Sequence, residues 1–183
     1  MSNVPSRLDP GSAVLIVIMG ASGCGKTSVG RGIAAGLAAD FIEGDALHPR
    51  RNLEKMSAGV PLNDADRGPW LDRIGGELQK ARAARRRVVV SCSALKRTYR
   101  DRLRQTVEDR LYFVFLRGSR DTLLERMMER RGHYMPPSLL DSQLATLEDP
   151  CDEPNVLSFD IDNASIEKII NDTRQKLEGL GII

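Results

Sequence analysis

A glycine-rich segment near the N-terminus constrains this chain more than any other feature. Residues 20–27 read GASGCGKT and fit the pattern G-x-x-x-x-G-K-[ST]. The glycines allow successive backbone N–H groups to converge on an anion, and the dipole of a helix that begins near Lys26 attracts the same anion. In this pattern the lysine reaches the β- and γ-phosphates of a nucleotide, and the hydroxyl of Thr27 faces Mg²⁺. The segment therefore predicts a phosphate-binding P-loop.

The flanking residues supply the context that this mechanism needs. An apolar run of strand length, residues 13–19, precedes the loop. After it, Val29, Ile33 and Leu37 recur at the spacing of one helix face. Strand, loop and helix favour the P-loop over the alternative, a tight turn of an ordinary α/β fold. The nucleotide-binding candidates in the loop are Gly20, Ser22, Gly23, Cys24, Gly25, Lys26, Thr27 and Ser28.

The rest of the chain alternates between strand and helix patterns. Further strands are expected at residues 40–45, 87–92, 111–116 and 156–160. Helices are expected at residues 26–39, 68–84, 97–106, 119–130, 138–148 and 165–178, with Ser138 and Ser165 as N-caps. This alternation predicts an α/β fold, a parallel sheet with helices on both faces. Its ligands should gather at the carboxyl ends of the strands.

Length and composition bound the domain organisation. The 183 residues, 41% hydrophobic and 28% charged, suit one domain over residues 13–183, with residues 1–12 as a polar, disordered leader. No apolar run approaches a membrane span, and the leader lacks the apolar core of a signal peptide. Three cysteines, at no metal-ligand spacing, favour reduced thiols and a cytoplasmic location. Cys24 is interpreted as a small packing residue or, if exposed, as an oxidation-sensitive thiol.

The basic residues are unevenly distributed. Residues 80–104 hold ten Lys or Arg and one acidic residue, Asp101, although the net charge is only +2. The alternatives are nucleic-acid binding and a solvated helix end followed by a site for an anionic substrate. Aromatic residues make up 4% of the chain and no RNA-binding signature is present, so the anionic substrate is favoured. Two isolated histidines, His48 and His133, do not predict a metal site, and Trp70 is expected to be a packing anchor.

Polar residues follow three of the expected strands. Glu43 and Asp45 end the second strand, where alternation would point both toward Mg²⁺ and an attacking hydroxyl; turn residues are the alternative. Small and hydroxyl residues, then cations, follow the third strand, as in a pocket for a polyhydroxy anion. After the fourth strand, a segment that contains Gly and Pro follows three arginines, Arg126, Arg130 and Arg131. This pattern suggests a lid that closes over the phosphates; the alternative is that the arginines are solvated charges at a helix end.

Three blocks of the sequence resemble the P-loop gluconate kinases (gluconokinases). They are GDALHPRRNLEKMSAGVPLNDADRGPWL at residues 44–71, CSALKRTYRDRLR at 92–104, and GHY with LLDSQLATLE at 132–134 and 139–148. The resemblance implies the fold of shikimate and nucleoside-monophosphate kinases: a five-stranded parallel sheet, a substrate-binding segment near residues 44–71 and a lid near residues 127–140. It also implies ATP-dependent phosphorylation of D-gluconate to 6-phospho-D-gluconate. Tyr134, Leu144, Glu43 and Cys24 depart from the residues usual in that family.

The resemblance also suggests roles for individual residues. The expected catalytic residues are Lys26, Asp45 and Arg130; Arg126 joins the P-loop in binding ATP; and Thr27, Glu43 and Asp45 hold Mg²⁺. The residues expected to bind gluconate are Asp45, His48, Arg51, Lys96, Arg97 and Arg100. No nucleic acid and no membrane are expected as partners, and a homodimer is left open. A kinase of another small acid, such as shikimate, and a nucleotide-binding module without turnover remain alternatives.

Overall fold

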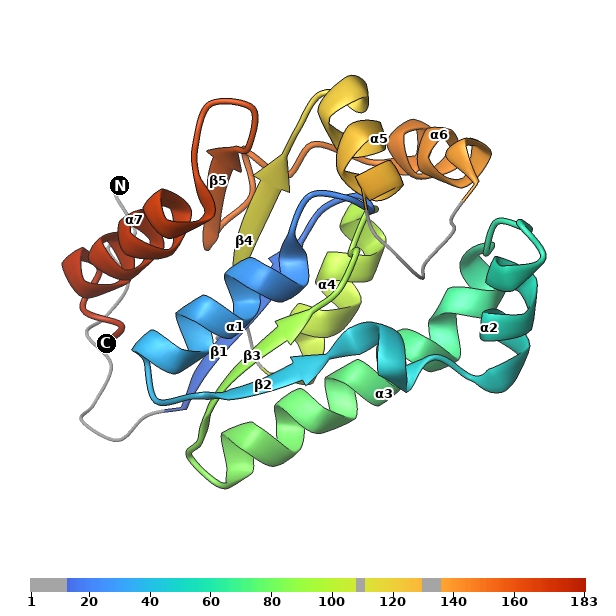
Figure 1. The fold of residues 1–183 in the computed structure, drawn as a ribbon. Helices are drawn as coiled ribbons and strands as arrows, with labels where there is room; N and C mark the ends of the chain where they lie inside the picture. The colour runs from blue at the N-terminus through green and yellow to red at the C-terminus, as the bar shows by residue number, and fades with distance from the viewer. Residues whose placement is uncertain (1–12, 108–110, 130–135) are drawn as a thin grey trace.

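The computed structural model describes residues 13–107, 111–129 and 136–183. Its centre is a five-stranded sheet in the order β2-β3-β1-β4-β5, and all of its strand pairs are parallel (Figure 1). The strands are β1 (Val14–Met19), β2 (Asp40–Glu43), β3 (Arg87–Ser91), β4 (Leu111–Arg117) and β5 (Val156–Asp160). The predicted parallel sheet is therefore confirmed. The second strand ends two residues earlier than expected, because the chain turns into a short 3₁₀ helix there.

The helices follow the predicted order with two additions. They are α1 (Lys26–Gly36), η1 (Gly44–Leu47), α2 (Arg50–Ser57), α3 (Asp64–Ala83), α4 (Arg97–Thr106), α5 (Arg120–Glu129), α6 (Pro137–Thr146) and α7 (Ile166–Gly179). Neither the 3₁₀ helix η1 nor the helix α2 was predicted. Helix α3 begins before residue 68 because Asn63 and Asp66 form a capping box. In the part of the chain that the structure describes, no helix has the length and apolar character needed to cross a bilayer.

The two predicted N-cap residues have different outcomes. The Ser165 hydroxyl accepts a hydrogen bond from the backbone N–H of Lys168, as expected of an N-cap. Ser138 is not an N-cap, because α6 already begins at Pro137 and Pro136 occupies the cap position. Proline is favoured in the first turn because its missing N–H group has no partner in the helix there.

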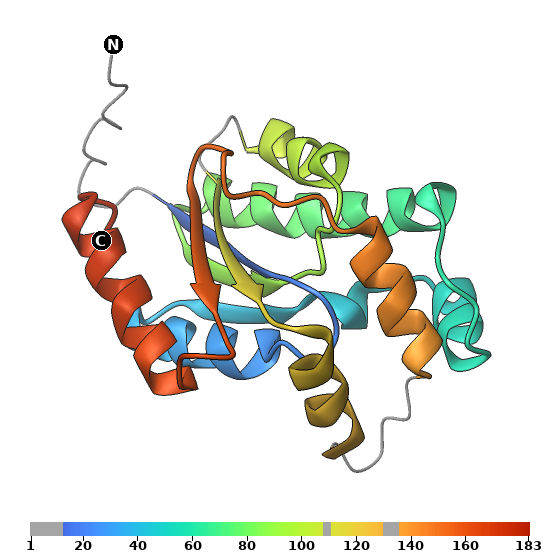
Figure 2. The ribbon, with the colours of Figure 1, turned by 90° about the horizontal axis from the view of Figure 1, so that it is seen from above.

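Helices cover both faces of the sheet, as Figure 2 shows from above. Side chains of β1 alternate between two separate cores: Ile16 and Ile18 pack with α1 and α7 on one face, and Leu15 and Val17 pack with α3 and α4 on the other. Every residue of β1 is buried. Trp70 is fully buried in the second core, so its predicted role as a packing anchor is confirmed.

Gly44 forms the junction between β2 and η1. Its N–H donates to the Ser91 hydroxyl (3.0 Å), and its carbonyl accepts a hydrogen bond from the Trp70 indole (2.7 Å). A Cβ atom at this position would lie 1.9 Å from the Ser91 carbonyl oxygen. Only glycine therefore allows β2 and β3 to approach this closely at the point where the chain turns toward Asp45.

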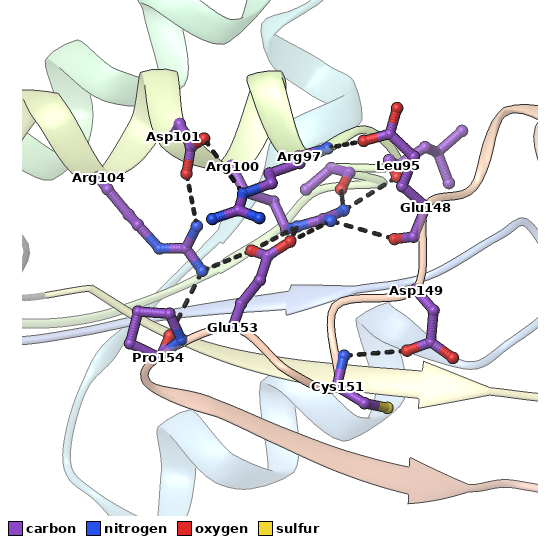
Figure 3. A network of polar contacts seen from close by, with 11 residues as sticks. Leu95, Arg97, Arg100, Asp101, Arg104, Glu148, Asp149, Cys151, Glu153 and Pro154 are labelled. Carbon is purple, nitrogen blue, oxygen red and sulfur yellow. Dashed lines mark hydrogen bonds and ion pairs between the residues drawn. The ribbon is translucent and has the colours of Figure 1, made fainter.

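A buried ion-pair network joins α4 to the segment between α6 and β5 (Figure 3). The Arg100 side chain is fully buried and its guanidinium pairs with Glu153, with Nη2 lying 2.5 Å from the carboxylate. Nη1 donates to the carbonyls of Ala94 and Leu95 (both 2.9 Å), and Nη2 donates also to the Glu148 carbonyl (3.1 Å). The prediction that Arg100 binds the substrate is therefore wrong, because every nitrogen of its guanidinium is occupied within the fold.

The same network holds the Glu153 carboxylate from a second side. Arg104 pairs with it at 2.8 Å and also contacts Asp101. Burial alone would raise the pKa of Glu153, but the hydrogen bonds from both arginines outweigh it and hold that pKa below its usual range. The network fixes residues 94 and 95, and so positions the segment that follows β3.

We predict that Gly44→Ala destabilises the protein by about 2 kcal/mol or more, because the added methyl group meets a backbone carbonyl that cannot move freely. Chemical denaturation measures this change. The matched control is Gly76→Ala within α3, where the added Cβ meets no atom within 4 Å. That variant should be neutral or more stable by up to about 1 kcal/mol. Equal stability of the two variants would contradict the close approach at Gly44.

We predict that Arg100→Ala lowers the free energy of unfolding by about 3–5 kcal/mol, because it leaves the Glu153 carboxylate buried with one partner fewer. Since the pKa of Glu153 is depressed in the folded state, its contribution is present above the unfolded pKa and is lost as the pH falls through the folded value. Glu153→Gln should therefore flatten the acid side of the stability profile. If both variants are as stable as wild type and Arg100→Ala raises the KM for the acceptor, Arg100 binds the substrate after all and its structural role is contradicted.

Candidate active site

The P-loop links β1, the central strand of the sheet, to α1. Gly25 is the N-cap of α1 and has a φ of 92°, in the left-handed region that glycine adopts without strain. No side chain caps this helix end, so the N–H groups of its first turn have no side-chain acceptor. Together with the helix dipole, these groups form a site for a phosphate group. Helix α1 begins at Lys26, as the sequence predicted.

Lys26 folds back over the loop that precedes it. Its Nζ donates to the carbonyls of Gly20 (3.1 Å) and Ala21 (3.0 Å) and lies 4.0 Å from the Cys24 sulfur. The Cys24 side chain is buried in the core against α1 and α7, so the alternative that it is an exposed thiol is wrong. The loop carbonyls keep the ammonium group of Lys26 at the phosphate-binding loop.

Glu43, the last residue of β2, contacts the P-loop. Its Oε2 accepts a hydrogen bond from the Thr27 hydroxyl (2.8 Å), and its Oε1 accepts one from the Ser91 hydroxyl. A threonine hydroxyl beside a carboxylate offers the oxygen ligands that Mg²⁺ prefers. No group of three or more His, Cys, Asp and Glu within the described ranges is arranged to hold a metal ion. Mg²⁺ sites in kinases, however, use one or two carboxylates together with water and substrate phosphates.

Asp45 occupies a different environment from the one predicted. It lies in η1 rather than on β2, so the strand-alternation argument that paired it with Glu43 is wrong. Its carboxylate is 69% exposed and lies 3.9 Å from Nε2 of His48. Glu43 thus contacts Thr27 while Asp45 lines a neighbouring pocket.

This pocket lies between the P-loop, α2, α3 and α6. Its polar lining includes the ammonium group of Lys26, the Asp45 carboxylate and the Arg67 guanidinium. The remaining lining residues are Ser22, His48, Met56, Val60, Pro61, Leu62, Ser93, Leu139, Ser142 and Gln143. A cation of the phosphate-binding loop, a carboxylate and a second cation therefore face one cavity. Such a cavity suits an anionic molecule that carries hydroxyl groups.

Arg67 is the pocket residue that the sequence analysis missed. It is only 8% exposed; its Nε donates to the Leu62 carbonyl (3.4 Å), and its Nη1 donates to the Ser93 hydroxyl (3.4 Å). These hydrogen bonds hold the guanidinium at the cavity wall. A signal was present in the sequence: Arg67 precedes Trp70 and Ile74 at the spacing of the buried face of α3. An arginine on an otherwise apolar helix face needs an anionic or polar partner.

His48 is buried beside the pocket. Its ring stacks on Trp70, with ring centroids 4.1 Å apart and ring planes within 14° of parallel. Burial lowers the pKa of His48 to about 4; the nearby charge of Asp45 opposes the shift, and that of Arg67 adds to it. The imidazole is therefore neutral at pH 7. The prediction that His48 belongs to the substrate pocket is consistent with this position.

The structure does not bring the other predicted substrate cations to the pocket lining. The Arg51 side chain is 77% exposed and lies 3.6 Å from Asp66. Lys96 pairs with Asp64 (2.7 Å), which also accepts a hydrogen bond from the Tyr99 hydroxyl. Arg97 is exposed, 3.8 Å from Asp101. Each of these cations has an acidic partner within the fold.

The predicted lid is described only in part. Arg126 on α5 donates from Nη2 to the Ile161 carbonyl (3.1 Å), after β5. On α6, Gln143 accepts a hydrogen bond from the Ser22 backbone N–H of the P-loop (2.7 Å). Arg130, Arg131 and His133 lie outside the described residues, so their predicted roles are not tested.

Comparisons with known proteins identify the family of this chain. Residues 15–150 match the family model described as an AAA domain. A gluconokinase of Gluconobacter oxydans is 50% identical over 142 residues, which cover 78% of this chain and 79% of the relative. A probable gluconokinase of Schizosaccharomyces pombe is 40% identical over 177 residues, covering 88% and 92% of the two chains.

A solved structure gives the same result in three dimensions. The crystal structure of a gluconokinase from Sinorhizobium meliloti superposes with a TM-score of 0.83 at 51% identity, covering 91% of this chain and 93% of that one. A match over most of both chains extends well beyond the P-loop. The chain therefore belongs to the gluconokinase family of P-loop kinases.

Proposed function

We propose that this protein transfers the γ-phosphoryl group of ATP to the 6-hydroxyl group of D-gluconate, giving ADP and 6-phospho-D-gluconate. One observation carries the proposal: Lys26, Asp45 and Arg67 line the same pocket, beside the backbone amides of the α1 N-terminus, which no side chain caps. Lys26 can bind a phosphate group, Asp45 can accept a proton, and Arg67 can bind the carboxylate of a substrate. D-gluconate presents a carboxylate at one end and a primary hydroxyl group at the other, which matches this set of groups.

The nucleotide side of the reaction uses the P-loop. The backbone amides of residues 23–27 bind the ATP phosphates, and Lys26 exchanges its loop carbonyls for phosphate oxygens. Thr27 and Glu43 would hold Mg²⁺, which neutralises phosphate charge when it is bound. Arg126 lies on the helix that leads toward the predicted lid, and Arg130 remains a predicted ligand of the transferring group.

The acceptor side uses the cavity wall. Arg67 binds the gluconate carboxylate, since a guanidinium matches a carboxylate in both charge and shape. Asp45 orients the 6-hydroxyl group and accepts its proton, and the neutral ring of His48 lies next to this carboxylate. Phosphoryl transfer depends chiefly on positioning and charge stabilisation, and these residues supply both. The acceptor is therefore held with its anionic end at Arg67 and its reactive end at the P-loop.

A coupled assay of ADP release over a panel of acids tests this proposal. Gluconate should be phosphorylated with the highest kcat/KM, and related sugar acids and shikimate should follow well behind. If shikimate or another acid is preferred, the protein is a kinase but gluconate is not its substrate. Tight ATP binding without turnover of any acid would favour a nucleotide-binding module.

Asp45→Asn should lower kcat by at least about a hundredfold, because the amide keeps the shape of the side chain but cannot accept the proton. The KM for ATP should change little, since the P-loop binds the nucleotide. Glu43→Gln is the matched variant, and it should raise the Mg²⁺ concentration needed for half-maximal rate more than it lowers kcat. If Glu43→Gln instead lowers kcat and Asp45→Asn alters the Mg²⁺ dependence, the two residues have the opposite roles. If both variants keep kcat within tenfold of wild type, neither residue has the role proposed for it.

Arg67→Gln should raise the KM for gluconate roughly ten- to hundredfold, because a charge-assisted hydrogen bond contributes about 1.5–3 kcal/mol. The KM for ATP should stay near the wild-type value. Arg102→Gln is the control: it removes an exposed arginine that pairs with Asp72, and both KM values should stay within about twofold. An equal rise of both KM values in Arg67→Gln would assign Arg67 to the fold rather than to the substrate.

A further inference from the structure

Asn52 on α2 lies directly behind the substrate pocket. It is 2% exposed, and its side-chain nitrogen Nδ2 donates to the backbone carbonyl of Asp66 (2.8 Å). The same nitrogen lies 3.2 Å from Nδ1 of His48. A buried amide that faces both a fixed carbonyl and an imidazole restricts the positions of the protons between them.

The carbonyl determines the orientation of the amide. The Asp66 carbonyl oxygen can only accept a hydrogen bond, so the Asn52 NH₂ group, and not its oxygen, must face it. The second hydrogen of this NH₂ group is then directed to His48, and Nδ1 of His48 must be the acceptor. This conclusion depends on the chemistry of the partners and not on distinguishing nitrogen from oxygen in the side chain.

A neutral imidazole carries one N–H group. With Nδ1 unprotonated, that hydrogen lies on Nε2, the ring nitrogen nearer to Asp45. An Nδ1 atom that accepts the Asn52 hydrogen bond carries no hydrogen itself, so the ring holds its hydrogen on Nε2 while it is buried against Trp70. The stacking contact with Trp70 also fixes the plane in which the Nε2–H bond points.

We propose that Asn52 is a positioning residue that fixes the Nε2–H tautomer of His48 and thereby places a hydrogen-bond donor beside the Asp45 acceptor in the pocket. Nε2 and Oδ1 of Asp45 are 3.9 Å apart, which is longer than a hydrogen bond. The donor is therefore not used by Asp45, and both atoms can bind a third group. A hydroxyl group fits this pair, since it accepts from Nε2–H and donates to the carboxylate.

This pairing also defines the chemical class of the acceptor at this point of the pocket. A carbonyl or carboxylate group there would accept from Nε2–H but would face the Asp45 carboxylate without a hydrogen to donate. A carboxylate would also be repelled by the like charge of Asp45, and a carbonyl would form only one of the two hydrogen bonds, so the pair discriminates in favour of hydroxyl groups. The assignment of this hydroxyl group to the sugar acid rests on the proposed function, whereas the tautomer of His48 does not.

The tautomer is measured directly by ¹H–¹⁵N correlation of the imidazole in the full-length protein labelled with ¹⁵N-histidine. The chain has two histidines, so a His133→Asn variant assigns the signals. At pH 7 and without ligand, His48 should show a protonated Nε2 and an unprotonated Nδ1. A protonated Nδ1, an averaged mixture or an imidazolium would overturn the proposal. This measurement needs no substitution in the pocket and no activity.

Asn52→Leu tests whether Asn52 sets the tautomer. It keeps the branched shape of the side chain but removes the donor, and the imidazole should then show a mixture of tautomers. The KM for gluconate should rise about three- to tenfold, in line with one lost hydrogen bond, with the KM for ATP unchanged. A pure Nε2–H tautomer in this variant would overturn the role of Asn52.

His48→Gln and His48→Leu separate the donor from the packing. Both lose the ring that stacks on Trp70, but glutamine carries an amide nitrogen near the position of Nε2. The KM for gluconate should be about three- to tenfold lower in His48→Gln than in His48→Leu. Equal KM values would show that the ring only packs, which overturns the donor role. If the wild-type protein releases no ADP with gluconate, the proposed function is wrong. The tautomer of His48 is then still decided by the NMR measurement, which does not depend on activity.

Discussion

The parallel pairing of β1 with β3 and β4 is the interaction on which the site depends. Ile18 of β1 is in register with Ser91 of β3 and with Val114 of β4, so the three strands run toward the same edge of the sheet. The P-loop leaves the central strand at this edge. On one side of it, β2 ends at Glu43, and the segments after β2 and β3 supply Asp45 and Ser93. A kinase needs its phosphate ligands and its acceptor pocket around the same transferring phosphoryl group, and this edge of the sheet brings them together.

The electrostatics of the site follow from which cations lack an acidic partner at close range. Most cations of the basic stretch at residues 80–104 have one: Arg86 pairs with Asp40, Arg102 with Asp72, and Arg100 with Glu153. The acids come from distant parts of the chain, so a count along the sequence overstates the local positive charge. Arg67 instead donates to a carbonyl and a hydroxyl, and its guanidinium forms no ion pair with a carboxylate among the residues that the structure describes.

The sequence predicts well what repeats locally and poorly what depends on distant partners. The P-loop, the strand–helix alternation and the Ser165 cap are visible in short windows, and the structure confirms them. Asp45 was misplaced because Gly44 turns the chain out of β2 under the constraint of Ser91, a residue on another strand. Arg67 and Arg100 both lie on the buried faces of their helices. Only the positions of Glu153 and Ser93 show that one arginine belongs to the fold and the other to the pocket.

The Arg100 network also has a consequence for how the sequence can vary. Every nitrogen of this guanidinium has its own acceptor, on a side chain or on backbone carbonyls that no substitution can remove. Lysine carries the same charge but one nitrogen, so it cannot reproduce the fork that ties these segments together. A lysine at position 100 would therefore not preserve the network. A change at position 153 that removes the carboxylate would leave the buried charge of Arg100 without its ion-pair partner. The residues at positions 100 and 153 therefore constrain each other, so that neither can be replaced alone without loss of stability.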